Sequence, residues 1–532
     1  MLGRSLRIVL SVSLLIAGVV RADAVLDWNS TLLDAVRVDR TAPPKAARAM
    51  AMVHIAIFDA VNGITPAYEP YLVTPAAPNG ASADAAAVEA AYRTLAALFP
   101  AQVATFDAAR ASSLATIPDG AAKNAGISWG AQVAQAILAS RAGDHSADVV
   151  NGSYPTGANW WIPTAPAFAT PLLPNWPTVT PWCMARGDQF RSDAPPPPNS
   201  AAYAEAFREV KELGRAGSAT RTADQSQIAL FWADGAGTAT PPGHWLEIAQ
   251  SISEDRNLTL IQNARLFALL GLTVADAAIV AWDTKYAYSN WRPITGIQHA
   301  DTDGNPDTDA DATWTPFIAT PPFPSYTSGH STFSASSARL LSHFFNTDAI
   351  SFSTTSDGLP GVTRSYTSLA QAADEAGQSR IYGGIHWQFD NVTGLRNGRA
   401  LADQVFFGFL GPVTQSGICN PGATTLCLND GRFKVEAKWK TASAGDNARA
   451  EAQGNDSGRF WFFSAGNTEV VVKVLNGCTL NNRYWVFASG LTNVETLITV
   501  TDTESGTTRR YFNPQGSVFA PVQDVEAFAT CP

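Results

Sequence analysis

Two hydrophobic periodicities divide the chain. Up to about residue 412, apolar and alanine residues recur at the three- and four-residue spacing of amphipathic helices. The clearest predicted helices span residues 44–61, 82–98, 201–213, 224–232, 274–291 and 331–345. From residue 432 the pattern changes to strict alternation, with Phe433, Val435 and Ala437 on one side of a predicted strand and charged residues on the other. The pattern therefore predicts a mainly α protein, built on a helical bundle, that ends in a small β domain.

The β part continues with further short strands. These are predicted at residues 460–463, 469–475, 484–487 and 497–502, with turn residues between them. Several short strands in series are typical of a β-sandwich. Because this part shows no cluster with catalytic spacing, we expect it to have a binding or stabilising role. The predicted units are a signal peptide (1–22), a helical catalytic domain (23–412), a linker (413–425) and a C-terminal β-sandwich accessory domain (426–532).

The first 22 residues predict export. Arg4 and Arg7 precede an apolar run over residues 8–20, which is followed by small residues. This order is typical of a secretory signal peptide, and the apolar run is too short to span a membrane. No later stretch is expected to reach the roughly 18 apolar residues of a helical span. We therefore expect a secreted or periplasmic protein without membrane insertion.

Charge and cysteine usage narrow the class further. The 532-residue chain has a formal net charge of −10, which argues against nucleic acid as a partner. Four cysteines cluster in the last quarter of the chain, and four cysteines permit three pairings. Because short local loops close easily, the favoured pairing is Cys419–Cys427 with Cys478–Cys531. Cys183 would then remain as a buried free thiol.

Candidate chemistry begins with two cations near a proline. Lys285 and Arg292 are seven residues apart in the predicted helix 274–291, so we expect both side chains to leave the same helix face. Pro293 is expected to end this helix, because the residue before a proline is pushed out of the α region. Two like charges on one face are unfavourable unless an anion lies between them.

A second cluster, Ser328-Gly329-His330, comes directly before the predicted helix 331–345. The start of a helix offers N–H groups without intrahelical partners and the positive end of the helix dipole, and both attract anions. Ser328 adds a hydroxyl group, and His330 stands where it could give or take a proton.

The third cluster contains Arg380, His386 and Asp390. Gly383-Gly384 lets the backbone turn, so Arg380 and His386 can converge on one point. If the stretch is helical, the Asp390 carboxylate, four residues past His386, can hold one imidazole nitrogen and leave the other facing an anion. Together, the three clusters predict a pocket for a tetrahedral oxyanion such as phosphate or vanadate.

Read in order, the clusters form the motifs K-x6-R-P, S-G-H and S-R-x5-H-x3-D. They resemble the signature of the type 2 phosphatidic-acid phosphatase (PAP2) and vanadium haloperoxidase superfamily, over roughly residues 25 to 412. Thr327 departs from the pattern, because the family usually has proline there; we expect this to alter loop stiffness more than chemistry. The resemblance implies that His330 is the acid–base residue and that the residues holding the oxyanion are Lys285, Arg292, Ser328, Gly329 and Arg380.

Two activities share such a site. In an exported acid phosphatase, His386 would attack phosphorus and become a phosphohistidine, His330 would protonate the leaving alcohol, and Asp390 would orient His386. In a haloperoxidase, His386 would be the vanadium ligand, and hydrogen peroxide would oxidise halide to hypohalous acid. A non-catalytic, secreted oxyanion-binding protein is the least favoured alternative, because a complete set of catalytic residues has little reason to persist in one.

The surroundings of the motifs favour the haloperoxidase. Trp282 and Phe323 place aromatic rings beside the anion and are candidates for a halide pocket. Residues 322–330 resemble the fungal and bacterial vanadium haloperoxidase version of this loop, and a long helical domain also suits that branch. We therefore expect a secreted, vanadate-dependent haloperoxidase that uses hydrogen peroxide, a halide and a small organic acceptor.

An acidic loop and three histidines lie outside these motifs. Residues 301–311 place oxygen ligands at alternate positions, as a calcium loop does, but they lack the closing glutamate and Pro306 interrupts them. A polar loop between two motifs is therefore favoured over a calcium site. His54 and His343 lie in apolar helical runs and are predicted to be structural. His244 lies where a loop meets a helix start, which suits either the mouth of the active site or a capping role.

Overall fold

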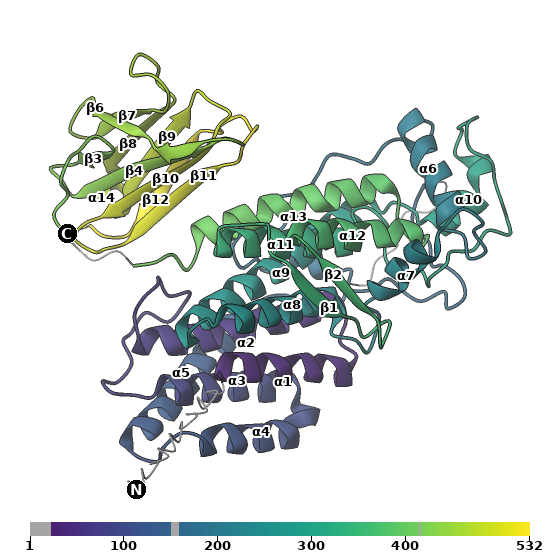
Figure 1. The fold of residues 1–532 in the computed structure, drawn as a ribbon, viewed down its shortest axis with the longest axis horizontal. Helices are drawn as coiled ribbons and strands as arrows, with labels where there is room; N and C mark the ends of the chain where they lie inside the picture. The colour runs from purple at the N-terminus through teal and green to yellow at the C-terminus, as the bar shows by residue number, and fades with distance from the viewer. Residues whose placement is uncertain (1–22, 151–158, 414–416, 532) are drawn as a thin grey trace, which may run out of the picture.

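The computed structural model describes residues 23–150, 159–413 and 417–531. The predicted signal peptide, residues 1–22, lies outside the described residues. Figure 1 shows a large helical body followed by a separate β unit at the C-terminal end of the chain. This arrangement confirms the predicted fold class, a mainly α helical bundle with a small C-terminal β-sandwich.

The helical body is built from the following elements in chain order: α1 (Ala24–Asp39), α2 (Pro43–Ile64), α3 (Ala83–Leu98), α4 (Val103–Ala115), α5 (Ala121–Ser140), α6 (Ala201–Leu213), α7 (Ala223–Phe231), α8 (Thr240–Arg256), α9 (Leu260–Tyr288), α10 (Pro293–Gln298), α11 (Gly329–Phe345), the strands β1 (Phe352–Thr355) and β2 (Thr363–Tyr366), α12 (Leu369–Tyr382) and α13 (Gln388–Gly408). The antiparallel β1–β2 hairpin lies against α8 and was not predicted from the sequence.

The centre of the body is α9, which packs against α2, α11 and α13. By length and composition α2 and α9 could each cross a membrane, so the expectation that no later stretch reaches that length was wrong. Both are core helices instead, because 83% of the apolar window of α2 and 94% of that of α9 are buried inside the protein. A helix that is apolar on all sides belongs in the core of a large domain as readily as in a membrane.

Close packing of α13 on α11 brings two of the predicted motifs together. At Gly398 of α13, an added Cβ would lie 2.4 Å from the carbonyl oxygen of Thr332, and at Gly394 it would lie 2.7 Å from that of Ser328. Larger side chains at these two glycines would push the helices apart. The start of α11 and the start of α13 therefore lie side by side.

The predicted helix 274–291 differs from the observed one. Helix α9 begins earlier, at a capping box formed by Thr259 and Gln262, and it ends at Tyr288, where Ser289 adopts the left-handed conformation with φ of 44°. Arg292 is then the N-cap of α10, and Pro293 begins that helix instead of ending the previous one. The prediction that Lys285 and Arg292 leave one helix face was therefore wrong. A proline at the first helical position is favourable, because the N–H group that it lacks would have no partner there.

The β unit consists of two five-stranded antiparallel sheets. One has the order β11-β10-β4-β3, with β5 paired to β4, and the other has the order β12-β9-β8-β7-β6. Their buried faces form a separate apolar core. The strands are β3 (Thr425–Leu428), β4 (Phe433–Lys440), β5 (Gly445–Asn447), β6 (Arg449–Ala452), β7 (Ser457–Trp461), β8 (Val470–Asn476), β9 (Tyr484–Gly490), β10 (Glu495–Asp502), β11 (Thr508–Asn513) and β12 (Val522–Phe528), with the short helix α14 (Cys478–Asn481) before β9.

The disulfides match the favoured pairing. Cys419 is bonded to Cys427, and Cys478 is bonded to Cys531. The second bond ties the end of the chain to α14, as expected from the sequence. Cys183 is a buried free thiol, which confirms the remaining cysteine prediction.

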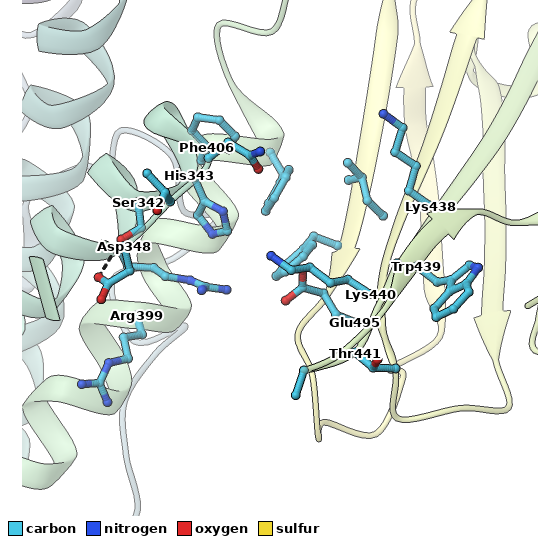
Figure 2. A pocket seen from close by; sticks show the side chains of 18 of the residues that line it. Ser342, His343, Asp348, Arg399, Phe406, Lys438, Trp439, Lys440, Thr441 and Glu495 are labelled. Atoms are coloured by element: carbon cyan, nitrogen blue, oxygen red, sulfur yellow. Dashed lines mark hydrogen bonds between the residues drawn. The ribbon is translucent and has the colours of Figure 1, made fainter. Parts of the chain in front are cut away.

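The two units touch at α13 and at the loop that follows α2. The ring of Phe407 in α13 stacks on Phe512 in β11, with ring centroids 4.2 Å apart. The backbone N–H of Thr508 donates to Glu69 Oε1 over 3.0 Å. A cavity of about 920 Å³ remains between the units. Figure 2 shows His343 on its helical side and Lys440 on its strand side, and its lining residues lie outside the predicted site.

Candidate oxyanion site

The three predicted clusters come together at one cavity of about 340 Å³. The end of α9, the start of α10, the start of α11, the last turn of α12 and the turn before α13 meet there. The predicted site residues that line the cavity are Trp282, Phe323, Gly329, His330, Arg380 and His386. Lys285, Arg292 and Ser328 are fully buried beside them. The structure thus brings together residues that lie about a hundred positions apart in the sequence.

Arg292 and Arg380 each have a buried N–H group without a hydrogen-bond partner among the described residues. Arg292 donates from Nε to the carbonyl oxygen of Phe323 over 2.8 Å and from Nη1 to that of Ile385 over 2.7 Å, but its buried Nη2 has no hydrogen-bond partner in the described chain. Arg380 donates from Nη1 to the carbonyl oxygen of Trp232 over 2.9 Å, and its Nε is buried without a partner among the described residues. Buried N–H groups are rarely left unpaired, so these two indicate a missing acceptor.

Lys285 is bonded differently. Its Nζ donates to the backbone carbonyl oxygens of Pro324, Ser325 and Thr327, the first at 2.9 Å and the second at 2.8 Å. An ammonium group has three N–H donors, so all three are used. Lys285 therefore fixes the loop before α11, and it acts on the cavity through its charge. Its Nζ also lies 5.0 Å from the centroid of the Phe323 ring, within the range of a cation–π contact.

His386 is held by Asp390 at the start of α13. His386 Nδ1 lies 2.8 Å from Asp390 Oδ2, which also accepts from Ser325 Oγ over 2.5 Å and from the Trp387 N–H over 3.1 Å. His386 precedes the helix, so the contact arises from helix capping and not from two residues within one helical face. With Nδ1–H donating to the carboxylate, Nε2 keeps its lone pair, which accepts from Arg292 Nη1 at 3.0 Å.

His330 is the second residue of α11 and faces the same cavity. Its ring is hydrogen-bonded to the backbone of Ala233, and its buried Nε2 has no partner within the described ranges. Nε2 is therefore the nitrogen that can take a proton. Ser328 caps α11: its Oγ accepts from the Ser331 N–H at 3.3 Å and lies 2.8 Å from Ser331 Oγ, which donates to Asn391 Oδ1 at 2.8 Å.

The cavity carries excess positive charge. Burial lowers the pKa of Arg292 to about 9 and that of Arg380 to about 10, and burial together with the Arg292 charge lowers the pKa of Lys285 well below its usual range. Burial, and then the neighbouring cations, also lower the pKa of both His330 and His386 well below the usual histidine range. Buried charge of one sign is costly, and a bound anion would offset that cost.

Two acidic residues oppose the cations. Burial raises the pKa of Asp390, although the hydrogen bond from Ser325 and the Lys285 charge partly offset the effect. Asp234, which lines the cavity, raises the pKa of Arg380 against the lowering effect of burial. Neither Ser325 nor Asp234 was predicted as a site residue. Ser325 lies in the quoted 322–330 segment and could have been found there, whereas Asp234 follows the predicted helix 224–232 in a loop without a recognisable motif.

The candidate halide residues touch each other at the cavity wall. The ring centroids of Trp282 and Phe323 are 4.9 Å apart. Trp282 Nε1 donates to the carbonyl oxygen of Leu172, another lining residue, over 3.1 Å. The guanidinium carbon of Arg292 lies 4.8 Å from the Phe323 centroid. The wall is thus aromatic, with cations directly behind it.

Three of the five further histidines were also interpreted from the sequence, and each has polar partners of its own. His54 Nε2 is 3.0 Å from Asn29 Oδ1 inside the core, and His343 Nε2 is 2.6 Å from Asp403 Oδ1, so both have the structural contacts expected of them. His244 is buried beside the site and contacts Asp234, which does line the cavity.

The predicted calcium loop has internal contacts. Asp303 accepts from the Asn305 N–H at 2.7 Å and from Thr308 Oγ1 at 2.8 Å, and Asp311 forms an ion pair with Arg215. Across the part of the chain that the structure describes, no group of three or more His, Cys, Asp or Glu side chains is placed to hold a metal ion. Both carboxylates thus have structural partners, and calcium at residues 301–311 stays the less favoured, untested alternative to a polar loop.

Known proteins resemble this chain in sequence and in fold. Residues 265–409 match the family model described as the VCPO second helical-bundle domain. The chain is 27% identical over 485 residues to vanadium chloroperoxidase of Curvularia inaequalis, covering 69% of this chain and 78% of the relative. It superposes on a bacterial vanadium-dependent iodoperoxidase with a TM-score of 0.65 and 27% identity, covering 73% of this chain and 97% of the other. A bacterial vanadium-dependent chloroperoxidase in its holo form shares the fold, with a TM-score of 0.56, 16% identity and coverage of 69% and 92%.

Proposed function

We propose that the chain, which is similar to vanadium haloperoxidases, is a vanadate-dependent haloperoxidase that oxidises a halide with hydrogen peroxide to hypohalous acid. One observation carries the proposal. His386 Nε2 faces a pocket beside three buried cations, two of which have N–H groups without a hydrogen-bond partner among the described residues. This arrangement suits an oxyanion whose central atom can bond to a nitrogen lone pair.

The residues present fit vanadate. His386 Nε2 would be the protein atom bonded to vanadium, and Asp390 would keep the other ring nitrogen protonated. Arg292 Nη2 and Arg380 Nε would donate to vanadate oxygens. When bound, vanadate would supply a Lewis-acid centre that activates peroxide while the metal stays oxidised. Lys285 would contribute charge through the loop that it holds.

The start of α11 completes the proposed set. Ser328 Oγ accepts from the Ser331 N–H, and its hydroxyl proton would turn from Ser331 Oγ toward the anion, because the Ser331 hydroxyl proton can be donated to Asn391 Oδ1. The N–H groups of the first helical turn, beginning at Gly329, lack intrahelical acceptors and point toward the same end. His330 would take and return a proton at Nε2 during turnover, since that buried nitrogen has no partner among the described residues and its side chain lines the cavity.

Trp282 and Phe323 are the proposed halide wall. Their rings exclude water from one side of the cavity, and the Lys285 and Arg292 charges lie behind Phe323. A large, weakly hydrated anion suits a wall that is apolar on its surface and cationic beneath. A small organic acceptor would then be halogenated by the hypohalous acid that forms.

Compartment and domain organisation belong to the same proposal. The two disulfides are consistent with an oxidising compartment, and we propose export directed by residues 1–22. The proposed catalytic domain is 23–412, followed by a linker over 413–425 and an accessory β-sandwich over 426–532. Because the β-sandwich packs against α13, which begins beside His386, a stabilising role is the proposal for it.

Competition between phosphate and vanadate tests the site. Purified protein freed of bound anions should bind about one orthovanadate per chain in equilibrium dialysis, and phosphate should displace it, because one set of cations serves both anions. Saturating phosphate that left bound vanadate in place would contradict a single site. Rapid hydrolysis of a phosphate monoester without any halide oxidation would favour the phosphatase alternative, with His386 as the attacking group.

A further inference from the structure

Three consecutive residues after α7, Trp232, Ala233 and Asp234, hold two side chains of the proposed site. We name them the 232–234 segment. The Trp232 carbonyl oxygen accepts from Arg380 Nη1 over 2.9 Å, and the Ala233 backbone is hydrogen-bonded to the His330 ring. The orientation of both side chains therefore depends on where this segment lies.

Asp234, the last residue of the 232–234 segment, also acts on the proposed site. Its side chain is 4% exposed and lines the cavity, and its charge acts on Arg380. It also adopts a left-handed backbone conformation with φ of 43°, which is uncommon for a residue other than glycine. A segment in this conformation needs contacts that hold it in place.

His244, the fifth residue of α8, supplies such contacts from a second element. Its ring stacks on Trp232, with centroids 4.6 Å apart and an angle of 26° between the ring planes. Its Nδ1 lies 3.3 Å from each carboxylate oxygen of Asp234, and its Nε2 lies 3.3 Å from Thr354 Oγ1 in β1. One ring thus joins the end of α7, the start of α8 and the β1–β2 hairpin.

His244 is unlike an ordinary core histidine. It is 2% exposed, and both of its ring nitrogens have polar partners, whereas His54 is fully buried with one partner, at Nε2. The charged groups that act on His244 are Asp234, Glu247 and Asp357. Glu247 and Asp357 form ion pairs with Arg37. Asp234 is the carboxylate that contacts the His244 ring directly.

We propose that His244 is a positioning residue for halide oxidation: it holds the 232–234 segment so that His330 Nε2 and Arg380 Nε face the bound anion. This inference rests on the proposed function for its catalytic consequence. The role differs from simple filling of space, because it requires the nitrogen atoms of the ring as well as its flat shape.

The test compares His244→Phe with His244→Asn and with the control His54→Phe. Phenylalanine keeps a flat ring over Trp232 and removes both polar contacts. Asparagine keeps a donor close to the Nδ1 position and removes the stack. The control makes the same change at a buried histidine whose contacts lie in the core, outside the cavity lining.

Two measurements separate positioning from stability. Titration calorimetry with inorganic phosphate, and then with orthovanadate, reports the anion site without turnover. Steady-state kinetics reports kcat and the KM for bromide and for peroxide. Loss of an outer hydrogen bond to a ligand typically costs about 10- to 100-fold in affinity or activity, so we expect His244→Phe to weaken phosphate binding by about tenfold and to lower kcat with little change in the KM for bromide.

His244→Asn should recover part of the loss, because a donor to Asp234 remains, and His54→Phe should keep phosphate affinity within about twofold of wild type. The proposal is overturned if His244→Phe also binds phosphate within twofold of wild type, or if His54→Phe loses as much. If His244→Phe does not fold, His244→Asn decides: wild-type affinity and kcat in that variant overturn the proposal. A wild-type protein that binds phosphate but oxidises no halide would instead refute the proposed function.

Discussion

Replacing Asp390 with asparagine should separate vanadate binding from phosphate binding. In the structure, the carboxylate receives the Nδ1–H of His386 and so leaves the lone pair on Nε2. An asparagine amide can turn its NH2 group toward Nδ1, which stabilises the tautomer with the proton on Nε2. The atom proposed to bond vanadium would then lose its lone pair. Phosphate needs no such bond, because it is held by charge and hydrogen bonds.

The affinities for vanadate and for phosphate are expected to change differently. Loss of an outer-shell carboxylate partner typically costs 10- to 100-fold in metal affinity, or about 1.4 to 2.7 kcal/mol, so vanadate affinity of Asp390→Asn should fall within that range. Phosphate affinity should be unchanged or higher, because the substitution removes a negative charge from a pocket that contains three cations. The pKa of Asp390 is raised by burial, so the gain at neutral pH is smaller than that for a fully ionised carboxylate.

The assay is titration calorimetry of the wild type and Asp390→Asn with each anion, supported by circular dichroism to show that the variant is folded. Asp276→Asn is the matched control, since Asp276 is another fully buried carboxylate that accepts backbone N–H groups, but it lies away from the cavity lining. Equal losses for vanadate and phosphate would refute the tautomer argument. Unchanged vanadate affinity would refute His386 as the ligand.

Three further outcomes follow from the same contacts. His330→Ala should lose about 10²–10⁴-fold in rate and keep much of its vanadate affinity, whereas His386→Ala should exchange vanadate freely; calorimetry that showed equal affinity losses would leave the two roles unsupported. Truncation after Gly411 should leave a helical protein that binds vanadate, with a lower thermal midpoint, because the aromatic contact of α13 with β11 is lost; loss of the helical circular dichroism signal would show that the two units fold as one. Burial lowers the pKa of His54 to about 3, so below pH 6.5 the unfolded chain binds more protons than the folded chain, and stability is lost as the pH falls. Between pH 6.5 and pH 4 the loss is about 3 kcal/mol. In urea unfolding, the stability of His54→Gln should therefore fall by about 3 kcal/mol less than that of the wild type over this pH range.

The sequence predicted which residues meet at the cavity more accurately than it predicted the helices and turns that carry them. Lys285 and Arg292 were predicted as neighbours on one helix, yet the chain turns at Ser289 and Pro293 starts a new helix. They still converge, because Lys285 Nζ and the Arg292 guanidinium carbon lie 5.0 Å and 4.8 Å from the centroid of the same Phe323 ring. His386 and Asp390 were expected to interact through helical spacing, and they do interact, but through the capped start of α13.

Contacts made by residues far apart in sequence could not be predicted. Asp234 comes within reach of Arg380 only because α7 and α12 pack together, and no spacing within the sequence carries that information. The β1–β2 hairpin was missed because its short strands are mostly polar and partly exposed, which leaves little hydrophobic alternation to detect. The β-sandwich strands were found because each buries one face, and this produces a clear period of two.

A bromination assay on the purified full chain tests the central claim most directly. Protein freed of bound anions is mixed with bromide, hydrogen peroxide and an organic acceptor, with and without added orthovanadate. The account predicts that brominated product forms only when vanadate is present and that phosphate added beforehand suppresses the reaction. Equal bromination with and without vanadate, or none in either case from folded protein that binds vanadate, would contradict it.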